Sequence, residues 1–476
     1  MASHRPDAVV VGSGPNGLAA AITLARSGLA VTLFEQAATI GGGTRTEELT
    51  LPGFKHDVCS AIHPLGVASP FFQSLPLHEH GLEWIFPGIQ LAHPLPNGSA
   101  ALLYRSVEQT AYALGADAAG YKRLFAPLVH RWPDLASDLL APLHFPRHPL
   151  QMAGFGIMGL LPAHLLGRLI FKQQPAQALF AGLAAHSFLA LTQPLSAAFG
   201  LILGTLGHVA GWPLAKGGSA MIAEAMASYF RSLGGEIILS RELRTLGELP
   251  AARIAILDIT PRQLLAIAGH SLPPGYHHKL ERYRYGPGVF KIDYALDGPI
   301  PWSAAGCRQA ATIHVCGSEE EVSKSEQEVL KGQHPERPFV LLVQPTLFDP
   351  SRAPAGKQVA WAYCHVPNSS TVDMTARIEA QIERFAPGFR DLVLARHTRN
   401  CGEYERYNPN LIGGDINGGV QDLRQFLARP TLFSPYKTPL KGIYLCSSAT
   451  PPGGGVHGMC GYHAASAALK HIGKRP

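Results

Sequence analysis

The stretch DAVVVGSGPNGLAAAITLARSGLAVTLFEQ, residues 7–36, decides the fold. Residues 8–11 form a short apolar, β-branched run, which predicts a buried parallel strand. Residues 12–17 follow as a GxGxxG turn, residues 18–26 predict a helix, and residues 31–34 predict a second strand. This order of strand, glycine-rich turn, helix and strand is typical of a dinucleotide-binding domain.

Each part of this stretch has a physical role in holding a dinucleotide. Gly12 permits the tight turn, Gly14 lets the backbone approach a diphosphate, and Gly17 lets helix and strand pack closely. The helix N-terminus presents unpaired N–H groups and a partial positive charge to the phosphates. Glu35 ends the second strand and suits a carboxylate that binds ribose hydroxyls, so it argues against NADP.

The composition excludes several classes of protein. A chain of 476 residues, 46% hydrophobic and 16% charged, predicts an apolar globular protein with two domains or one elaborated domain. The net charge of +6 is scattered, which argues against nucleic acid but suits an anionic membrane surface. The seven cysteines form no CxxC pair, so we expect reduced thiols in a cytoplasmic setting and no metal site. The few residues before the first strand leave no room for a cleavable signal peptide.

A helical block from residue 106 to about residue 211 interrupts the dinucleotide-binding pattern and predicts a substrate cap. Between Lys172 and Lys216 the chain carries no charged side chain. One interpretation is a pair of buried cap helices. The other is an apolar wall for a lipophilic substrate, with a surface that dips into a membrane. His186 and Gln193 are among the residues that interrupt the run, which argues against a transmembrane helix.

Residues 359–366 predict a strand that carries an unusual face. Their period of two places Trp361, Tyr363 and His365 on one side and small residues on the other. That side is either the wall of a cavity or an ordinary packing surface between sheet and helices.

Three further motifs carry a resemblance to a known family. They are GGGTRT at residues 41–46, GFKHD at residues 53–57 and PPGGGVHGM at residues 451–459. Together with the N-terminal turn, they resemble FAD flavoproteins of the phytoene dehydrogenase type, within the amine-oxidase-like group. The stretches YGPG and GGDI place the resemblance nearest to the branch related to pyridine nucleotide-disulphide oxidoreductase domain proteins. The chain departs from the family at His457, where a proline is usual, and in a shortened hairpin near residue 247.

The resemblance implies an α/β fold of the GR2 flavoprotein type. A Rossmann-like FAD-binding domain would carry an inserted α+β substrate domain, made of a mixed sheet and a helical cap. The FAD-binding domain would be assembled from three segments, residues 1–75, 211–284 and 436–476. The substrate domain would take its hairpin and cap helices from residues 76–210 and its sheet from residues 285–435.

The motifs and the resemblance together give a set of expected site residues. Those expected to bind FAD are Gly12, Ser13, Gly14, Pro15, Asn16, Gly17, Glu35, Gln36, Gly42, Gly43, Thr44, Arg45, Leu243, Thr450, Gly455, Val456, His457, Gly458 and Met459. Those expected in the catalytic cavity are His457, His186, Tyr363 and His365. An imidazole at position 457 would donate a hydrogen bond to substrate or flavin and titrate near neutral pH, although it could instead simply fill the turn.

The expected activity is that of an FAD-dependent dehydrogenase or desaturase acting on a small lipophilic organic substrate. A hydride would pass from a C–H bond to flavin N5, and the acceptor of the electrons is left open between oxygen, a quinone and a protein. The alternatives are a redox-neutral flavin isomerase, a saturase that works from reduced FAD, and a flavin-binding scaffold with little turnover. We expect the protein to be cytoplasmic, with peripheral contact to a membrane.

Overall fold

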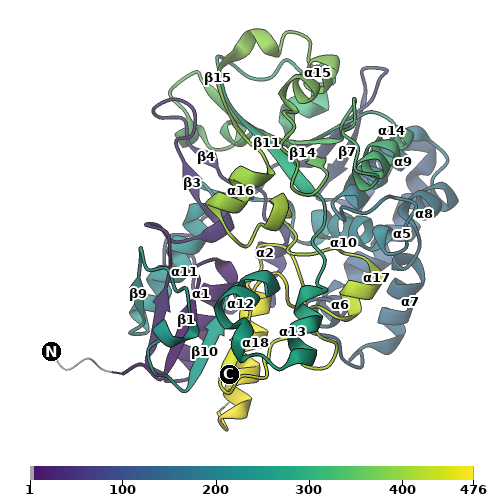
Figure 1. Cartoon of the computed structure of the whole chain (residues 1–476). Coiled ribbons are helices and arrows are strands. Elements are labelled where there is room, and N and C mark those ends of the chain that lie inside the picture. The colour runs from purple at the N-terminus through teal and green to yellow at the C-terminus, as the bar shows by residue number, and fades with distance from the viewer. Residues whose placement is uncertain (1–4, 475–476) are drawn as a thin grey trace.

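The computed structural model describes residues 5–474 and contains two large sheets, one low and one high in the view of Figure 1. The lower sheet is parallel in all its pairings and has the order β16-β10-β1-β2-β9. Its strands come from three distant regions of the chain, and their bounds are β1 Ala8–Val11, β2 Val31–Phe34, β9 Glu236–Ile238, β10 Ile254–Leu257 and β16 Ile443–Leu445. The strand–helix–strand unit predicted for residues 8–34 is confirmed.

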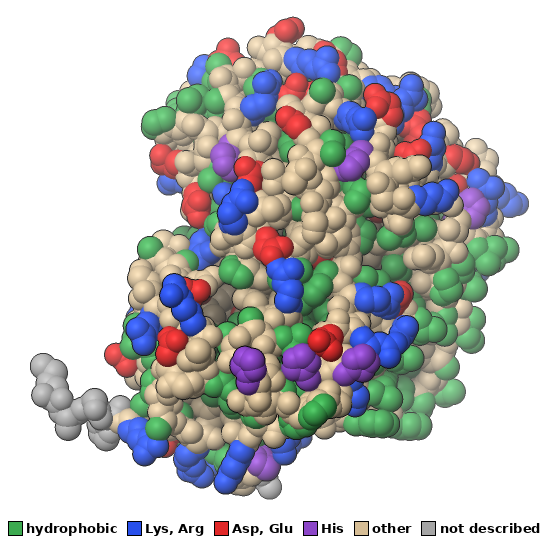
Figure 2. All heavy atoms as spheres, viewed as in Figure 1, with side chains coloured by type: hydrophobic (Ala, Val, Ile, Leu, Met, Phe, Trp, Pro, Cys, Tyr) green, Lys and Arg blue, Asp and Glu red, His purple; other side chains and the backbone are tan. Residues whose placement is uncertain are grey.

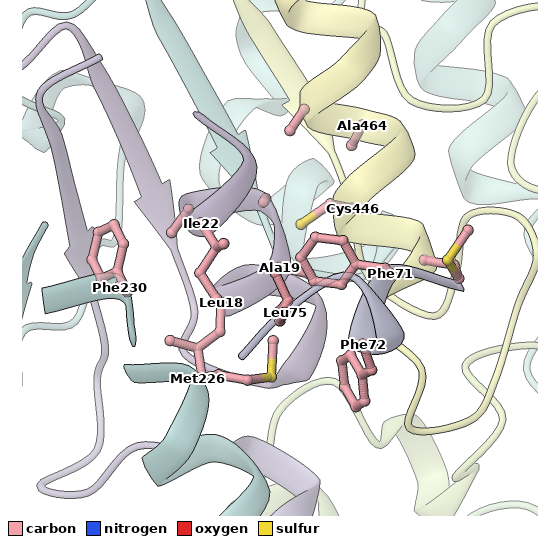
Figure 3. Close-up of a cluster of buried hydrophobic side chains, with 14 of the residues drawn as sticks. Leu18, Ala19, Ile22, Phe71, Phe72, Leu75, Met226, Phe230, Cys446 and Ala464 are labelled. Atoms are coloured by element: carbon pink, nitrogen blue, oxygen red, sulfur yellow. The ribbon is translucent and has the colours of Figure 1, made fainter. Parts of the chain in front are cut away.

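The first helix packs closely against the turn before it and against α18 (Met459–His471) because glycine lies at both contacts. Helix α1 (Pro15–Arg26) begins in the GxGxxG turn, and helices α11 (Ala220–Ser232) and α18 lie against it. A Cβ on Gly17 would lie 1.9 Å from the Gly12 carbonyl oxygen, and one on Gly461 would lie 1.8 Å from the Asn16 carbonyl oxygen. Figure 3 shows the apolar cluster that these helices share. Its labelled members are Leu18, Ala19, Ile22, Phe71, Phe72, Leu75, Met226, Phe230, Cys446 and Ala464.

The upper sheet is mixed and has the order β15-β11-β14-β13-β12-β6-β7. Only the β6–β12 pairing is parallel within this sheet. The bounds are β6 Ile89–Pro94, β7 Ala100–Tyr104, β11 Gly288–Leu296, β12 Ala310–Val315, β13 Val340–Val343, β14 Gln358–Val366 and β15 Val393–Arg399. One face of this sheet packs on α15 (Thr375–Phe385), and the other faces the cap, α14 (Glu319–Leu330) and the lower sheet.

The helical cap lies at the right of Figure 1. Its helices are α4 Val107–Ala113, α5 Ala118–His130, α6 Trp132–Leu139, α7 Pro149–Gly159, α8 Ala163–Ile170, α9 Gln174–Ala185 and α10 Ser196–Val209. The uncharged run before Lys216 forms α9 and α10, and both helices are mostly buried. Within residues 5–474, no single helix has the length and apolarity to cross a bilayer, and α7 with α8 meets that test only as a pair bent by 98°.

The remaining elements connect these layers. The small strands are β3 Thr46–Glu47, β4 His56–Asp57, β5 Trp84–Ile85 and β8 Leu214–Ala215. The other α-helices are α2 Pro64–Ala68, α3 Pro70–Gln73, α12 Pro261–Ala268, α13 Pro274–Glu281, α14 Glu319–Leu330, α15 Thr375–Phe385, α16 Cys401–Tyr407 and α17 Leu423–Leu427.

The buried carboxylate of Asp57 links the region around the lower sheet to the region around the upper sheet. Asp57 of the GFKHD motif accepts hydrogen bonds from the Ser219 backbone N–H (2.7 Å) and the Thr46 hydroxyl (2.8 Å), and it pairs with Arg352 at 2.9 Å. Burial alone would raise the pKa of Asp57, but Arg352 and these hydrogen bonds hold it below its usual value. The motif therefore has a structural role that its sequence did not reveal.

Candidate dinucleotide and substrate site

One cavity of about 700 Å³ runs from the GxGxxG turn to the upper sheet. Ser13 and Glu35 lie at one end of it, and Trp361 and Tyr363 lie in its wall at the other. Its volume falls within the range of about 300–1,000 Å³ that is usual for ligand and cofactor sites. The nucleotide-binding pattern and the aromatic face of β14 therefore belong to a single site.

Glu35 is held at the nucleotide end by a set of hydrogen bonds. Its Oε2 accepts from the Ser13 backbone N–H at 2.9 Å and the Ser13 hydroxyl at 2.6 Å. Its Oε1 accepts from the Ala37 backbone N–H at 2.9 Å and lies 3.4 Å from the guanidinium of Arg45. Arg45 also donates to the carbonyl of Thr39 at 2.8 Å. The carboxylate is thereby fixed at the carboxyl end of β2 and remains in the cavity lining.

The N-terminus of α1 has the features of a phosphate cradle. Gly14 is the N-cap and provides no side chain to satisfy the first-turn N–H groups. Asn16 lines the cavity, and its side-chain oxygen is buried without a hydrogen-bond partner among the described residues. A Cβ on Gly42 would lie 3.1 Å from the Cα of Gly14, so the second glycine turn packs onto the first. The uncapped N–H groups and the two glycine turns fit a dinucleotide diphosphate, whereas the Asn16 oxygen is an acceptor and adds no donor for it.

Asp258 lies in the same cradle and was not predicted. It follows β10, lines the cavity, and accepts a hydrogen bond from the Gly17 backbone N–H at 3.0 Å. Burial raises the pKa of Asp258 to about 7, and the charge of Glu35 adds to this while the Gly17 N–H opposes it. An ionised Asp258 would repel a diphosphate in the cradle, so its proton matters to binding.

Two histidines form a pair at the end of the cavity that borders the upper sheet. His186, at the end of α9, and His314, on β12, approach with their Nε2 atoms 3.0 Å apart. Trp212 packs edge-on against His186, with ring centroids 5.8 Å apart. Burial lowers the pKa of His186 to about 3 and the pKa of His314 well below its usual value. Both rings are therefore neutral near pH 7, and one Nε2–H bridges them.

A buried ion pair lies beside the aromatic residues of β14, on the same face of the sheet. Lys291 and Asp293 of β11 pair with each other, and the Lys291 ammonium lies 5.6 Å from the centre of the Trp361 ring. His56 approaches Asp293 at 3.7 Å from the side of β4. Burial alone would raise the pKa of Asp293, but Lys291 brings it below its usual value. The pair places a fixed polar group next to an otherwise apolar wall.

The cavity brings together most of the residues expected to bind a cofactor. The expected residues that line it are Gly12, Ser13, Gly14, Pro15, Asn16, Glu35, Gln36, Gly42, Gly43, Thr44, Arg45, Leu243, Gly455 and Val456. Those that are not in its lining are Gly17, Thr450, His457, Gly458 and Met459. Gly17 instead provides the close helix–strand contact expected of the third glycine.

The four residues expected in a catalytic cavity separate into two pairs. His186 and Tyr363 line the cavity, whereas His365 and His457 are not among its lining residues. The Nδ1 of His365 lies 2.7 Å from the Glu326 carboxylate, and the centre of its ring lies 3.8 Å from that of Phe188, with the two rings tilted by 35°. His365 therefore supports Phe188, which lines the cavity.

His457 is buried in the turn before α18. Its Nδ1 accepts a hydrogen bond from the Met459 backbone N–H at 3.0 Å, and its carbonyl accepts from the Ser69 hydroxyl at 2.6 Å. Burial lowers the pKa of His457 to about 4, so the ring is neutral near pH 7. These contacts give His457 a structural role, and its predicted role in the chemistry stays a prediction.

Sequence reasoning missed Asp258, His314 and Lys291. Asp258 could have been found from its place after a strand beside β1, because the carboxyl ends of parallel strands share one edge. His314 and Lys291 follow the period of two along their strands and face the same side as Tyr363. Nothing in the sequence of β11 or β12 alone identifies which residues contact Lys291 or His314.

Comparisons with known proteins agree with this geometry. The profile of the NAD(P)-binding Rossmann-like domain matches residues 10–75. The mouse (Mus musculus) pyridine nucleotide-disulfide oxidoreductase domain-containing protein 2 is 27% identical over 98% of this chain and 94% of its own length. A limonene dehydrogenase subunit of Castellaniella defragrans is 22% identical over 98% of this chain and 95% of its own length. Cyclohexylamine oxidase of Brevibacterium oxydans superposes with a TM-score of 0.62 at 15% identity, covering 98% of this chain and 100% of that one.

These proteins are oxidoreductases by name, and the match in fold extends over both sheets and the cap. The chain thus carries an NAD(P)-binding Rossmann-like domain, is homologous to pyridine nucleotide-disulfide oxidoreductase domain-containing protein 2, and shares the fold of the amine oxidases.

Proposed function

We propose that this protein is an FAD-dependent oxidoreductase that removes a hydride from a C–H bond of a largely apolar substrate, while a second hydrogen leaves as a proton to solvent, so that a C=C or C=N bond remains. The observation that carries the proposal is the continuity of the cavity from the Glu35 end to the aromatic wall at Trp361. A ligand that binds Glu35 through its ribose and reaches the upper sheet would bring its far end beside the substrate. FAD has this length, and when bound it supplies a two-electron acceptor for the hydride.

The nucleotide end supports FAD over NADP. Glu35 provides a carboxylate for ribose hydroxyls, and a negative charge there disfavours a 2′-phosphate. The turn at Gly42 and Gly43 extends the lining beyond what an NAD site needs, along the line towards Cys59 and Ala61. The cradle at α1 would hold the diphosphate through backbone N–H groups.

The substrate end supports an apolar substrate with one polar atom to orient. Leu203, Leu341 and Val343 join Trp361 in the wall, and such side chains exclude water from the reacting carbon. The Tyr363 hydroxyl has no hydrogen-bond partner among residues 5–474, and burial raises its pKa above the usual value, so it stays a neutral donor. His186 and Tyr363 are weak bases here, which suits orienting a substrate better than removing a proton from carbon.

The relatives' names are consistent with this substrate class. A dehydrogenase named for limonene acts on a hydrocarbon, and an oxidase named for cyclohexylamine acts on an amine with an apolar ring.

The test is anaerobic stopped-flow reduction of the FAD-loaded protein. The panel pairs apolar cyclic alkenes and amines with small polar analogues of the same functional group. We expect saturable bleaching by members of the apolar set and none by the polar set. Trp361→Ala should raise the substrate concentration for half-maximal rate, whereas Trp302→Phe, which is buried behind the sheet, serves as the matched control.

Three outcomes would contradict the proposal. A protein that does not bind FAD would remove its basis. Product without net flavin reduction would favour an isomerase. Reduction by small polar compounds alone would overturn the substrate class.

A further inference from the structure

The cap carries an apolar surface that nothing in the described residues covers. We call it the ledge and define it by seven side chains that are between 44% and 85% exposed. They are Leu143, Phe145, Leu150, Ile157, Leu160, Leu165 and Leu169. The residues come from α7, from α8, and from the loops before and between these helices. Figure 2 shows hydrophobic side chains gathered at the lower right, where Figure 1 places α7. Apolar surface gathered in this way marks an interaction site more often than chance exposure does.

The ledge is held firmly, so its exposure is a property of the fold. Asp138 is buried and accepts hydrogen bonds from the backbone N–H groups of Arg147 (3.0 Å) and His148 (3.2 Å). The His144 ring nitrogen lies 2.9 Å from the same carboxylate. These bonds fix the loop that presents Phe145, whose side chain is 85% exposed. On their inner sides α7 and α8 both pack against α10.

The unpaired charges beside the ledge are positive, whereas the acidic groups near it have partners: Asp134 lies 3.5 Å from the His148 ring, and Glu319 and Glu320 lie against Arg168. From residue 139 to residue 223 the chain contains no Asp or Glu. Arg147 and Lys172 are exposed and make no ion pair within the described part of the chain, whereas Arg168 pairs with Glu319 and Glu320 of α14. An apolar surface bordered by unpaired cations is complementary to an anionic lipid surface.

We propose that the ledge seats this protein on the surface of a lipid bilayer with anionic headgroups. The exposed apolar side chains of α7 and α8 enter the headgroup and acyl boundary, and Arg147 and Lys172 contact lipid phosphates. The 98° bend between the two helices suits a surface-lying element and not a span. The inference is independent of the proposed function.

Charge and position favour a bilayer over a second copy of this chain. In a twofold contact the same patch meets itself, which would bring Arg147 and Lys172 of both copies together, while the acidic groups beside the patch already lie against His148 and Arg168. The ledge also lies close to the cavity, because α10 contacts α7 and carries Leu203 in the cavity wall. An apolar compound dissolved in the bilayer would thus be one helix away from the cavity.

The experiment is flotation of the full-length, cofactor-loaded protein with vesicles at low and high salt. Vesicles of phosphatidylcholine alone are compared with vesicles that also contain phosphatidylglycerol. We expect flotation with the anionic vesicles, weakened by salt. The double variant Phe145→Ser/Leu150→Ser should lower the partition coefficient roughly tenfold or more. Arg147→Gln/Lys172→Gln should also lower it roughly tenfold, and only with anionic vesicles.

The matched control is Val372→Ser/Leu394→Ser, which removes exposed apolar side chains outside the cap and should leave flotation unchanged. The proposal is overturned if the wild-type protein does not float with anionic vesicles, or if the ledge variant floats as well as the control. It is also overturned if sedimentation shows that the ledge variant converts a dimer to a monomer without an effect on vesicles. Circular dichroism of each variant separates loss of binding from loss of folding.

Discussion

The Nε2 atoms of His186 and His314 lie 3.0 Å apart at the wall of the cavity, and each ring has one nitrogen left over. The Nδ1 of His314 is buried without a partner among the described residues, and a buried N–H without an acceptor is rarer than a bare acceptor. The bridging proton therefore belongs to the Nε2 of His314. His186 accepts that proton's hydrogen bond and carries its own proton on Nδ1, on the ring that lines the cavity.

In the proposed reaction, His314→Phe should weaken the hydrogen bond that His186 donates to the substrate. Without the bridging donor, the tautomer of His186 is no longer fixed, so its Nδ1–H becomes a less certain donor to the substrate. We expect the rate of flavin reduction at saturating substrate to fall about tenfold to a hundredfold, with FAD affinity unchanged. His314→Gln, which keeps an amide donor, should recover some of the rate. Equal reduction rates in both variants and the wild type would contradict this assignment.

Glu35→Gln should weaken the binding of FAD by about 1–3 kcal/mol, which is usual for loss of one charged hydrogen bond. The amide keeps the size of the side chain and one acceptor, so the contact with Ser13 survives better than in Glu35→Ala. Calorimetric titration of the apo protein gives the affinity directly. Glu236→Gln, on the neighbouring strand β9 but outside the cavity lining, is the control. Affinity equal to that of wild type would show that Glu35 does not hold the ribose.

His457→Ala should act on stability before it acts on chemistry. The substitution removes the acceptor for the Met459 N–H in the first turn of α18, and loss of such a cap costs about 1 kcal/mol. Because burial keeps the pKa of His457 near 4, the ring does not change charge between about pH 5.5 and 8.5. We expect a lower Tm and an unchanged pH profile of flavin reduction. A changed profile would support the role in chemistry that the sequence suggested.

The regions of the fold that were predictable are those with a local signal. The β1–α1–β2 unit follows from an apolar run, three glycines and helical periodicity within residues 8–34. The face shared by Trp361 and Tyr363 follows from the period of two along β14. The contacts that define the site are not local. His186 and His314 are 128 positions apart, and Asp258 is 241 positions from Gly17, so neither pair leaves a pattern in a single sequence.

Composition also could not tell buried apolar helices from exposed ones. The uncharged run at α9 and α10 was the stretch with the strongest apolar character, and it lies in the core of the cap. The exposed apolar surface is instead on α7 and α8, which precede that run and contain Arg168. Which helix lies at the centre is decided by packing against the upper sheet, and hydropathy alone does not contain that information.

Asp258 should couple the stability of the apo protein to pH. Its pKa is about 7 in the fold against an ordinary value of 3.8, so the folded state holds a proton that the unfolded state releases over this interval. Stability therefore falls as the pH rises from about 4 to about 7, by on the order of 4 kcal/mol in total, and is constant above that. Asp258→Asn keeps an acceptor for the Gly17 N–H but cannot ionise. Urea unfolding of the apo variant should show less of this decline, whereas the exposed Asp391→Asn should match the wild type.

The protonation of Asp258 should also affect the affinity for the cofactor. A diphosphate in the cradle adds negative charge near Asp258 and raises its pKa further, so binding takes up a proton when the carboxyl is ionised. The affinity of the wild type for FAD should then fall by up to about tenfold per pH unit above pH 7, and that of Asp258→Asn should stay flat. Fluorescence titrations between about pH 6 and 8.5 measure both slopes, an interval that spans the group's pKa. Parallel slopes in the two proteins would mean that Asp258 is protonated at every pH tested or lies apart from the diphosphate.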